Sequence, residues 1–505
     1  MTFLNNLIRR QESRPHSYFN LLMLATFIGI GRAVQEHLFF GERVTIPVAL
    51  SMIYFYFSFA MLLTVILTWL TSENPRRVAN AVNLGIFVGL FPPLIDLLVS
   101  GFSNDVKYSY FMIWNFKEIP YFFYSEIYNV PAGESVTIWL SVIFSGYYCF
   151  FKTRSLVKSL VALLAAYLAF LTIFAIIPML TTRFFVGDIR SLLEMQSARG
   201  HVANMSTMLY PFWYLGLSLL SFFALRSGVL KRLAPRLLHT VPFVLVTLWA
   251  AQLQNGIVDL EAALGALAVA FVFMAALVQN DYHDKIEDTR RMDFRIEKSD
   301  SEFFQILIMG FLFWLLIMGI KAFLPLVVIF MLTILYHHPG YRLKKYWLGS
   351  LKVEAAWGGL SFLTGLFLHP KVPIKPELVI TMLLVAGGWS VVAAQKDLKD
   401  LRGDRAAGIS TLYLWLRTRT RSLRKAHLII SWAVFTVFAV FSCLIALQND
   451  FLGFSILMGI SFFILFSSLY TGLKFSKKGW FKRQLVLLSL FFLAVLLLEV
   501  KLVTF

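Results

Sequence analysis

Charged residues are scarce in this chain of 505 residues, and their scarcity excludes the soluble classes of protein. Asp, Glu, Lys and Arg together make up 15% of the sequence, whereas a soluble globular protein carries about a quarter. Hydrophobic residues make up 58%, and phenylalanine alone occupies 50 positions. The hydrophobic stretches are too numerous for any class other than a protein that crosses a membrane many times.

Cysteine is also scarce, since the two cysteines, Cys149 and Cys443, both lie inside apolar segments. They offer neither a disulfide framework nor a metal site built on thiolates. The first apolar stretch follows Arg9 and Arg10 but lacks a clear small-residue cleavage site. We therefore expect this stretch to stay in the protein as a membrane span, and not to be removed as a signal peptide.

Acidic residues are outnumbered by basic ones, 28 against 46, which gives a net charge of +18. A charge of this sign can indicate nucleic-acid binding. Here the basic residues stand in short loops between apolar stretches, where Lys and Arg mark the cytoplasmic side of a membrane protein. We therefore expect no nucleic-acid partner and a lipid bilayer as the surroundings.

Apolar stretches of about 20 residues, the length that spans a bilayer, occur about 15 times. Six precede Arg226, at 18–34, 46–70, 79–101, 135–151, 157–180 and 206–225. Nine follow, at 238–254, 259–280, 303–320, 322–338, 349–368, 376–395, 426–446, 451–472 and 484–502. The sequence thus predicts an all-α polytopic membrane protein with a six-helix domain (1–225), a basic cytoplasmic linker (226–236) and a nine-helix domain (237–505).

The basic loops give one consistent topology for these spans. The N-terminus falls on the cytoplasmic side, and so do the later loops at 281–295, 342–345, 396–425 and 477–483. The segments 102–134 and 181–205 fall on the outer side. We expect an integral multi-pass protein of the cell or inner membrane.

Two acidic clusters of matching spacing end two of the predicted spans. The first, Asn280 to Asp288, reads NDYHDKIED, and the second, Lys396 to Asp404, reads KDLKDLRGD. In each cluster three aspartates stand at i, i+3 and i+7, which puts them on one face of a helix. These aspartates are Asp281, Asp284, Asp288, Asp397, Asp400 and Asp404. Both clusters fall on the predicted cytoplasmic side, as they must if they share a substrate.

Six carboxylates gathered in this way repel one another unless cations lie between them. Oxygen ligands without Cys or His suit Mg²⁺, which usually accompanies a substrate phosphate. Metal ions that hold a diphosphate between two carboxylate clusters neutralise the charge that grows as its C–O bond breaks. Basic side chains on the same predicted side are available to complete such a clamp, namely Arg295, Arg342, Lys344, Lys345 and Lys396. An apolar, aromatic cavity below it would shelter an isoprenoid tail and a carbocation.

The second half of the chain resembles the UbiA superfamily of intramembrane prenyltransferases. That family carries NDxxDxxxD at the end of its second helix and a DxxDxxGD-type motif at the end of its sixth. The two clusters end the second and sixth of the last nine predicted spans. Two further stretches, LYHHPGYRLKKYWLGSL (Leu335 to Leu351) and GDRAAGISTL (Gly403 to Leu412), match the family's loop patterns. The first six spans have no counterpart in that fold.

The resemblance implies Mg²⁺-dependent transfer of a prenyl group from a polyprenyl diphosphate to an aromatic or other lipophilic acceptor, as in quinone, lipid or pigment biosynthesis. The six aspartates would be the catalytic residues and, with Asn280, the metal ligands, in a site that faces the cytoplasm. The substrate would be bound by Asn280, Arg295, Tyr336, Arg342, Lys344 and Lys396. Tyr336 is included because the family pattern has tyrosine at that place.

Two alternatives stay open. The first is an enzyme of the same fold with another outcome, such as a terpene cyclase or a phosphate-acceptor transferase. The second is an ion-coupled transporter or a lipid-flipping protein whose carboxylates bind coupling ions. Transporters often place charge near the bilayer midplane, and these clusters end their helices on one side, which favours the enzyme.

The first half gives fewer indications of function. Arg32 and Glu36, at i and i+4 near the end of a span, are expected either to form a local ion pair or simply to reach the membrane interface. Asp96 stands inside an apolar stretch, where a carboxylate indicates function by default, although a kinked helix near the surface explains it equally well. The segment from Lys117 to Val130 is a candidate interfacial amphipathic helix. We expect this half to present a lipid substrate, to recruit a protein partner or to pack against the catalytic cavity.

Overall fold

The structure is a computed structural model in which every regular element of the described residues is a helix. It describes the chain except for residues 1, 42–45, 103–130, 174–195, 257, 259, 284–295, 318–321, 339, 369–373, 400, 407, 447–450, 474–479 and 504–505. The predicted amphipathic helix from Lys117 to Val130 therefore lies outside the described residues.

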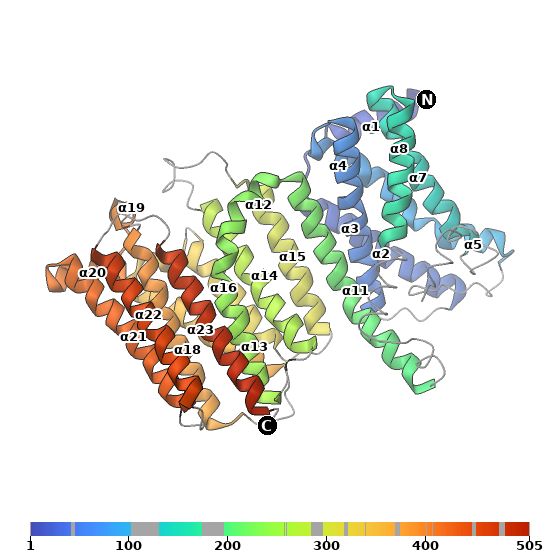
Figure 1. The fold of residues 1–505 in the computed structure, drawn as a ribbon. Helices are drawn as coiled ribbons and strands as arrows, with labels where there is room; N and C mark the ends of the chain where they lie inside the picture. The colour runs from blue at the N-terminus through green and yellow to red at the C-terminus, as the bar shows by residue number, and fades with distance from the viewer. Residues whose placement is uncertain are drawn as a thin grey trace. The chain divides into compact units, whose positions relative to one another are not determined.

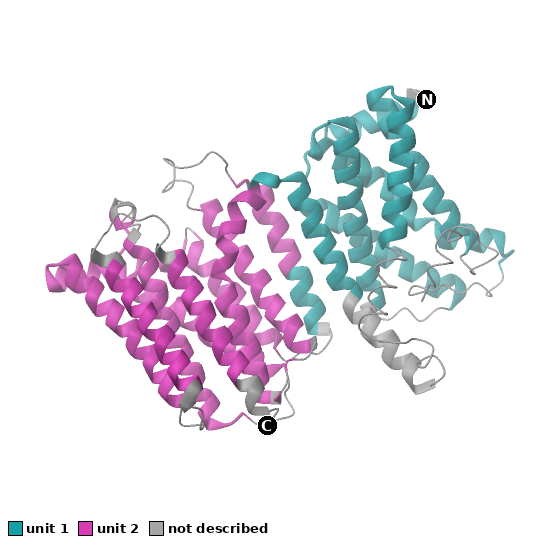
Figure 2. Cartoon of the chain, in the orientation of Figure 1, with its two compact units in different colours: residues 1–228, 309–318 teal, residues 229–308, 319–505 magenta. Residues whose placement is uncertain are grey.

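The chain divides into two compact units, which Figure 2 shows in different colours. Unit 1 comprises residues 1–228 together with 309–318. Unit 2 comprises residues 229–308 and 319–505. The second acidic cluster and the described part of the first both belong to unit 2.

Unit 1 is built on one central helix, which five of its other helices contact (Figure 1). Its helices are α1 (Thr2–Glu12), α2 (Tyr18–Phe40), α3 (Ile46–Thr71), α4 (Pro75–Ile86), η1 (Phe87–Leu90), α5 (Pro92–Val99), α7 (Ala132–Thr153), α8 (Leu156–Leu171) and α11 (Gln196–Leu225). The central helix is α3, which contacts α2, α4, α7, α8 and α11. Its 26 residues include no charged side chain, as is typical of a helix that lies in a protein core or spans a membrane.

The third predicted span, 79–101, is a broken helix made of α4, η1 and α5. Asn74 begins it by accepting a 2.9 Å hydrogen bond from the backbone N–H of Arg76, and proline follows at the first helical position. Two further prolines, Pro92 and Pro93, begin α5, and their missing N–H groups explain why the helix is interrupted before them. Asp96 lies in α5 and is buried within the protein, with only 3% of its surface exposed.

Unit 2 is a bundle whose long helices lie side by side (Figure 1). Its elements are α12 (Ser227–Leu233), η4 (Ala234–His239), α13 (Val241–Asn255), α14 (Leu260–His283), α15 (Lys298–Ile317), α16 (Phe323–His337), η6 (Leu343–Lys345), α17 (Trp347–Phe367), α18 (Pro376–Gln395), η7 (Lys396–Lys399), α19 (Leu401–Ala406), α20 (Leu412–Thr420), α21 (Leu423–Ala446), α22 (Phe451–Leu473) and α23 (Trp480–Val503). Residues 309–317 of α15, together with the following residue 318, are grouped with unit 1. Each of the nine predicted spans after residue 236 corresponds to one helix of at least 15 residues.

Length and composition support a protein that crosses the membrane several times. Within the described residues, eight helices are long and apolar enough to do so, or nine if the bent pair at 210–239 forms one span. Three further apolar helices, α8, α13 and α16, are shorter. The predicted all-α, multi-pass membrane protein is thereby confirmed.

The close packing of α13 against α17 holds the centre of unit 2 together. Gly365 of α17 lies so near α13 that a Cβ atom there would overlap the carbonyl oxygen of Thr247 and lie 2.7 Å from the Cβ of Ala250. The hydroxyl of Thr247 also donates a 3.0 Å hydrogen bond to the carbonyl oxygen of Ser361. Small residues let membrane helices approach in this way, since packing and interhelical hydrogen bonds replace the hydrophobic effect.

Replacing Gly365 by alanine should therefore destabilise unit 2. We expect Gly365→Ala to lower the free energy of unfolding by about 1–3 kcal/mol, the usual cost of overpacking a tight interface. Gly387→Ala in α18 is the matched control, because nothing lies within 4 Å of a Cβ atom at that position. Thermal unfolding of the purified protein in detergent measures both, and equal stability of the two variants would contradict the tight contact.

Candidate functional site

Two contacts bring the ends of α14, α16 and α18 together at one end of unit 2. The ring of His283, the last residue of α14, lies 6.1 Å from the ring of His338, which follows α16. The Nζ atom of Lys396, which follows α18, lies 5.8 Å from the centre of the Tyr336 ring near the end of α16. The helices that carry the two acidic clusters therefore end close to the same helix terminus.

Asp281 of the first cluster is buried and paired with two arginines. Its side chain is 1% exposed, and its two carboxylate oxygens accept hydrogen bonds from Arg232 of α12 and Arg236 of η4. A buried carboxylate needs such partners because an unpaired charge is very costly away from water. From the sequence, both arginines were expected only to be part of a basic linker. Their i, i+4 spacing just before the first of the nine spans could have indicated a shared partner, because it places both on one helix face.

The other members of the first cluster are less fully described. Asn280 is half-buried next to Asp281. Asp284, Asp288 and Arg295 lie outside the described residues, so their predicted roles stay predictions.

Lys396 begins the second cluster and forms an ion pair with Glu354 of α17. Glu354 is 4% exposed, and its other carboxylate oxygen accepts a 3.1 Å hydrogen bond from the indole N–H of Trp389. The carboxylate of Glu354 thus connects α17 both to Trp389 of α18 and to Lys396, which directly follows α18. Sequence reasoning missed Glu354, although a carboxylate inside the apolar stretch 349–368 is by itself an indication of function.

Asp397 of the second cluster lies near a buried tyrosine. Asp397 and Asp404 are half-buried, and Asp400 lies outside the described residues. The hydroxyl of Tyr413, on α20, is hydrogen-bonded to Nδ1 of His427 at 2.8 Å. Burial raises the pKa of the Tyr413 phenol, and the nearby carboxylate of Asp397 raises it further, so the phenol remains protonated.

The basic loop after α16 is fixed by its own backbone. Arg342 adopts a left-handed conformation with φ of 40°, and its backbone N–H donates a 2.8 Å hydrogen bond to the carbonyl oxygen of His338. The side chains of Arg342 and Lys344 are half-buried. The backbone N–H of Ser410 donates a 2.9 Å hydrogen bond to the carbonyl oxygen of Lys345. This bond ties the loop after the second cluster to the loop after α16.

Tyr336 and His337 end α16 beneath these loops. The Tyr336 hydroxyl is hydrogen-bonded to the hydroxyl of Ser350 at 3.0 Å, and its ring lies 5.2 Å from that of Trp357. His337 is 5% exposed, and its Nδ1 atom makes no hydrogen bond with the described residues. Most buried polar atoms have a partner, so this nitrogen is a candidate contact for a ligand.

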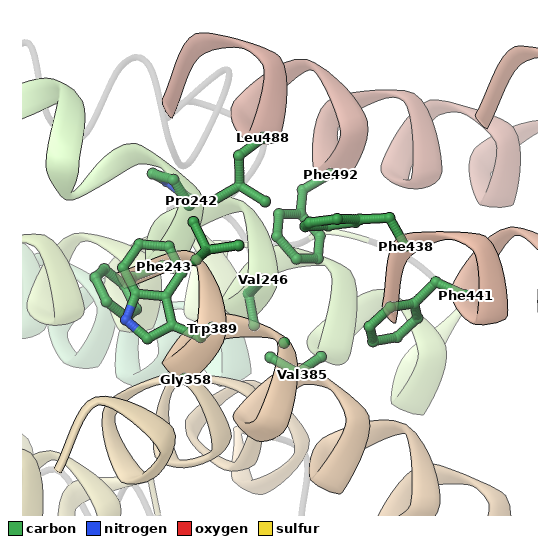
Figure 3. Close-up of a pocket in the computed structure, with 12 residues that line it drawn as sticks. Pro242, Phe243, Val246, Gly358, Val385, Trp389, Phe438, Phe441, Leu488 and Phe492 are labelled. Atoms are coloured by element: carbon green, nitrogen blue, oxygen red, sulfur yellow. The ribbon is translucent and has the colours of Figure 1, made fainter. Parts of the chain in front are cut away.

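An aromatic pocket lies within the same bundle, between α13, α17, α18, α21 and α23 (Figure 3). Its wall includes Phe243, Trp389, Phe438 and Phe492. The Phe243 and Trp389 rings lie 4.1 Å apart. Since the indole N–H of Trp389 binds Glu354, the pocket and the second cluster share a supporting side chain.

The described members of the clusters fit a hard divalent cation in their chemistry. Asn280, Asp281, Asp397 and Asp404 offer oxygen donors of the kind that Mg²⁺ prefers. In the described part of the chain, no group of three or more His, Cys, Asp or Glu converges on a metal position. Three of the six aspartates lie outside that part. The two arginines already hold both oxygens of Asp281, so a cation at that carboxylate would displace at least one of them.

Removing the charge of Glu354 should leave Lys396 without its ion-pair partner. We expect Glu354→Gln to lower the free energy of unfolding by about 1.5–3 kcal/mol, the contribution of a hydrogen bond to a charged group. The double variant Glu354→Gln with Lys396→Met should recover most of that loss, because the unpaired charge is gone. Glu377→Gln, at an exposed position of α18, is the control. Thermal unfolding measures the stability of all three variants. A double variant less stable than Glu354→Gln alone would contradict the ion pair between Glu354 and Lys396.

Comparison with solved structures finds proteins similar to about half of the chain. A UbiA homolog from Archaeoglobus fulgidus bound to GPP and Mg²⁺ is 15% identical, with a TM-score of 0.39, and the match covers 53% of this chain and 98% of that one. The same homolog bound to DMAPP and Mg²⁺ is also 15% identical, with a TM-score of 0.38 and coverage of 53% and 97%. A digeranylgeranylglyceryl phosphate synthase is 18% identical, with a TM-score of 0.40 and coverage of 54% and 99%. No curated protein matches the chain.

A family model, that of the UbiA prenyltransferase family, matches residues 240–496. The match covers just over half of the chain and includes both acidic clusters and the loop between α16 and α17. It begins after the six predicted spans at 18–225, as the resemblance of the motifs predicted. The chain therefore belongs to the UbiA prenyltransferase family and is an intramembrane prenyltransferase.

Proposed function

We propose that the enzyme transfers a prenyl group from a polyprenyl diphosphate to an aromatic or other lipophilic acceptor, with Mg²⁺ as its cofactor. The observation that carries the proposal is the chain of contacts from Lys396 through Glu354 to Trp389. It joins the polar end of α18 to an aromatic pocket in the same bundle. A polar head next to an apolar pocket suits a substrate that has a diphosphate at one end and a hydrocarbon chain at the other.

The diphosphate would lie among the aspartates and the basic side chains. Mg²⁺, when bound, neutralises the charge that grows on the leaving diphosphate as the C–O bond breaks. Asp281 would turn to the cation, and Arg232 and Arg236 would move to phosphate oxygens, which a planar guanidinium binds with two parallel hydrogen bonds. Arg342 and Lys344, which are half-buried at the same end of the bundle, would bind further phosphate oxygens, as would Arg295.

The prenyl chain would occupy the aromatic pocket. Each buried CH₂ group contributes about 0.8 kcal/mol, so a chain of isoprene units binds strongly without polar contacts. The rings of Phe243 and Trp389 offer faces that stabilise an allylic cation, and the surrounding phenylalanines exclude water from it. The same exclusion keeps the cation from being hydrolysed before the acceptor attacks.

The acceptor forms its new bond to the allylic carbon and loses a proton, which needs a base. His337 is a candidate because it is buried, lies next to Tyr336, and its Nδ1 atom has no hydrogen bond within the described residues. A neutral imidazole nitrogen with a free lone pair can take such a proton.

The cytoplasmic orientation of the site is proposed from the basic loops. The described residues that we propose bind the metal or the substrate all lie in unit 2. This supports the proposal that unit 1 delivers a lipid substrate or recruits a protein partner.

Single carboxylate variants test the clamp. Asp281→Asn and Asp397→Ala should each lower turnover of a polyprenyl diphosphate in native membrane extract at least about 10²-fold, because each removes stabilisation of the leaving group. Glu261→Gln, an exposed position in the first turn of α14, should stay within a few fold of the unaltered enzyme. EDTA should abolish turnover and added Mg²⁺ should restore it. Aspartate variants as active as Glu261→Gln would remove the basis of the proposal.

A histidine pair tests the proposed base. His337→Gln should lower kcat at least about 10²-fold, within the range that general base catalysis contributes, and should leave the KM for the diphosphate unchanged. His338→Gln is the control, because His338 is exposed and its Nδ1 accepts a hydrogen bond from the backbone N–H of Gly340. Steady-state kinetics of both variants measure this, and equal effects of the two would assign the base elsewhere.

Labelling of a single cysteine tests the orientation. In a variant without Cys149 and Cys443, Thr418→Cys lies on the exposed face of α20 and should react with a membrane-impermeant maleimide only from the cytoplasmic side. Labelling of intact cells from outside would place the loop after the second cluster on the opposite side.

A further inference from the structure

Unit 1 buries an ionic cluster that the reaction does not use. Arg32 of α2 donates hydrogen bonds to Glu36 at 2.7 Å, to the hydroxyl of Tyr56 at 3.1 Å, and to Glu134 of α7. The predicted local ion pair between Arg32 and Glu36 is thereby confirmed. Neither carboxylate is more than 8% exposed, and among the described residues one guanidinium is shared between the two.

Asp96 adds a third carboxylate close to this cluster. It accepts a 2.6 Å hydrogen bond from the backbone N–H of Gly133, the residue before Glu134. A Cβ atom at Gly133 would overlap the carbonyl oxygen of Pro92 and lie 2.7 Å from an oxygen of Asp96, so only glycine allows this approach. The start of α7 is thus held against α5 with Glu134 facing Arg32. Ionisable side chains so deep within apolar helices indicate function by default.

The cluster borders a pocket of unit 1. Part of its wall is a polar face of α7, where Glu134, Thr137 and Ser141 stand at i, i+3 and i+7. Another part is aromatic, formed by Phe55 and Phe59 of α3 and Phe170 of α8, whose ring centres lie 5.5 to 6.0 Å apart. The pocket therefore has a polar side and an aromatic side.

Two acceptor atoms in the pocket have no hydrogen bond in the described part of the chain. Thr137 is 9% exposed, and its hydroxyl Oγ1 makes no hydrogen bond. Oε1 of Glu134 accepts a hydrogen bond from Arg32, whereas its other carboxylate oxygen, Oε2, makes no hydrogen bond with the described residues. A buried hydroxyl left without a partner costs about 1–3 kcal/mol, which a bound donor would recover.

We propose that this pocket binds the protonated amine of an amphiphilic molecule. The ammonium group donates to Oε2 of Glu134 and Oγ1 of Thr137, and the apolar part of the ligand packs against Phe55, Phe59 and Phe170. An ammonium carries three N–H donors and no acceptor, which matches a pair of acceptors beside a carboxylate. Aromatic faces attract cations and hydrocarbon alike.

Other ligand classes fit the same wall less well. An anion would meet the carboxylate of Glu134, while Arg32 is already engaged by two carboxylates. A metal ion would need several converging ligands, and no group of three or more His, Cys, Asp or Glu is placed to hold one among the described residues. A neutral hydrocarbon would leave both acceptor atoms without a donor.

A small amine and an alcohol of similar shape test the site in the full-length purified protein. Hexylamine, which is protonated at neutral pH, should raise the thermal unfolding midpoint in detergent in a saturable manner, whereas hexanol at the same concentrations should not. Thr137→Val, which keeps the shape and every charge, should weaken hexylamine binding at least about tenfold, as should Glu134→Gln. Glu73→Gln removes a carboxylate of unit 1 that does not line the pocket, and it should bind hexylamine as the unaltered protein does.

Nanodiscs distinguish the source of the amine. If phosphatidylethanolamine suppresses hexylamine binding and phosphatidylcholine does not, the natural ligand is a lipid headgroup; if neither competes, it is a free amine, and both results support the site. A shift of equal size with hexanol, a shift unchanged in Thr137→Val, or no shift with hexylamine at any concentration would overturn the proposal.

Discussion

The pairing of buried charges inside an apolar bundle is the constraint on which the rest of this structure depends. A carboxylate or ammonium removed from water must find an opposite charge nearby, because an isolated charge is too costly to bury. In unit 2 this condition joins Asp281 to two arginines that precede α13, and Lys396 to Glu354 of α17. Helices that are otherwise free to slide along apolar faces are thereby fixed with their polar ends together.

The same pairs connect the polar end of the bundle to its apolar interior. Glu354 binds Lys396 with one oxygen and the indole of Trp389 with the other, and Trp389 forms part of the aromatic pocket. A prenyltransferase needs both environments in contact, since the bond that breaks lies between a charged diphosphate and a hydrocarbon chain. The contacts of Glu354 explain how a structural ion pair and a substrate pocket can be positioned by one side chain.

The sequence predicted the helices and the family, but it did not predict the partners of the buried charges. Apolar length identifies each span, and the spacing of Asp281 and its cluster identifies a carboxylate face, because both signals are local. The partners of Asp281 and Lys396 come from elements 45 and 42 residues away, and their approach depends on how the helices pack. The interruption of the third span was readable in principle from Pro92 and Pro93, whereas the tight fit of Gly365 against α13 was not.

A structure of the enzyme with a non-reactive prenyl thiodiphosphate and Mg²⁺ would show whether the buried ion pairs open to bind the substrate. We expect a metal-bound diphosphate in contact with Asp281 and Asp397, the arginines at 232 and 236 turned from Asp281 toward phosphate oxygens, and the prenyl chain in the pocket beside Trp389. A diphosphate bound elsewhere, with the pairs of Arg232 and Arg236 to Asp281 unchanged, would contradict it.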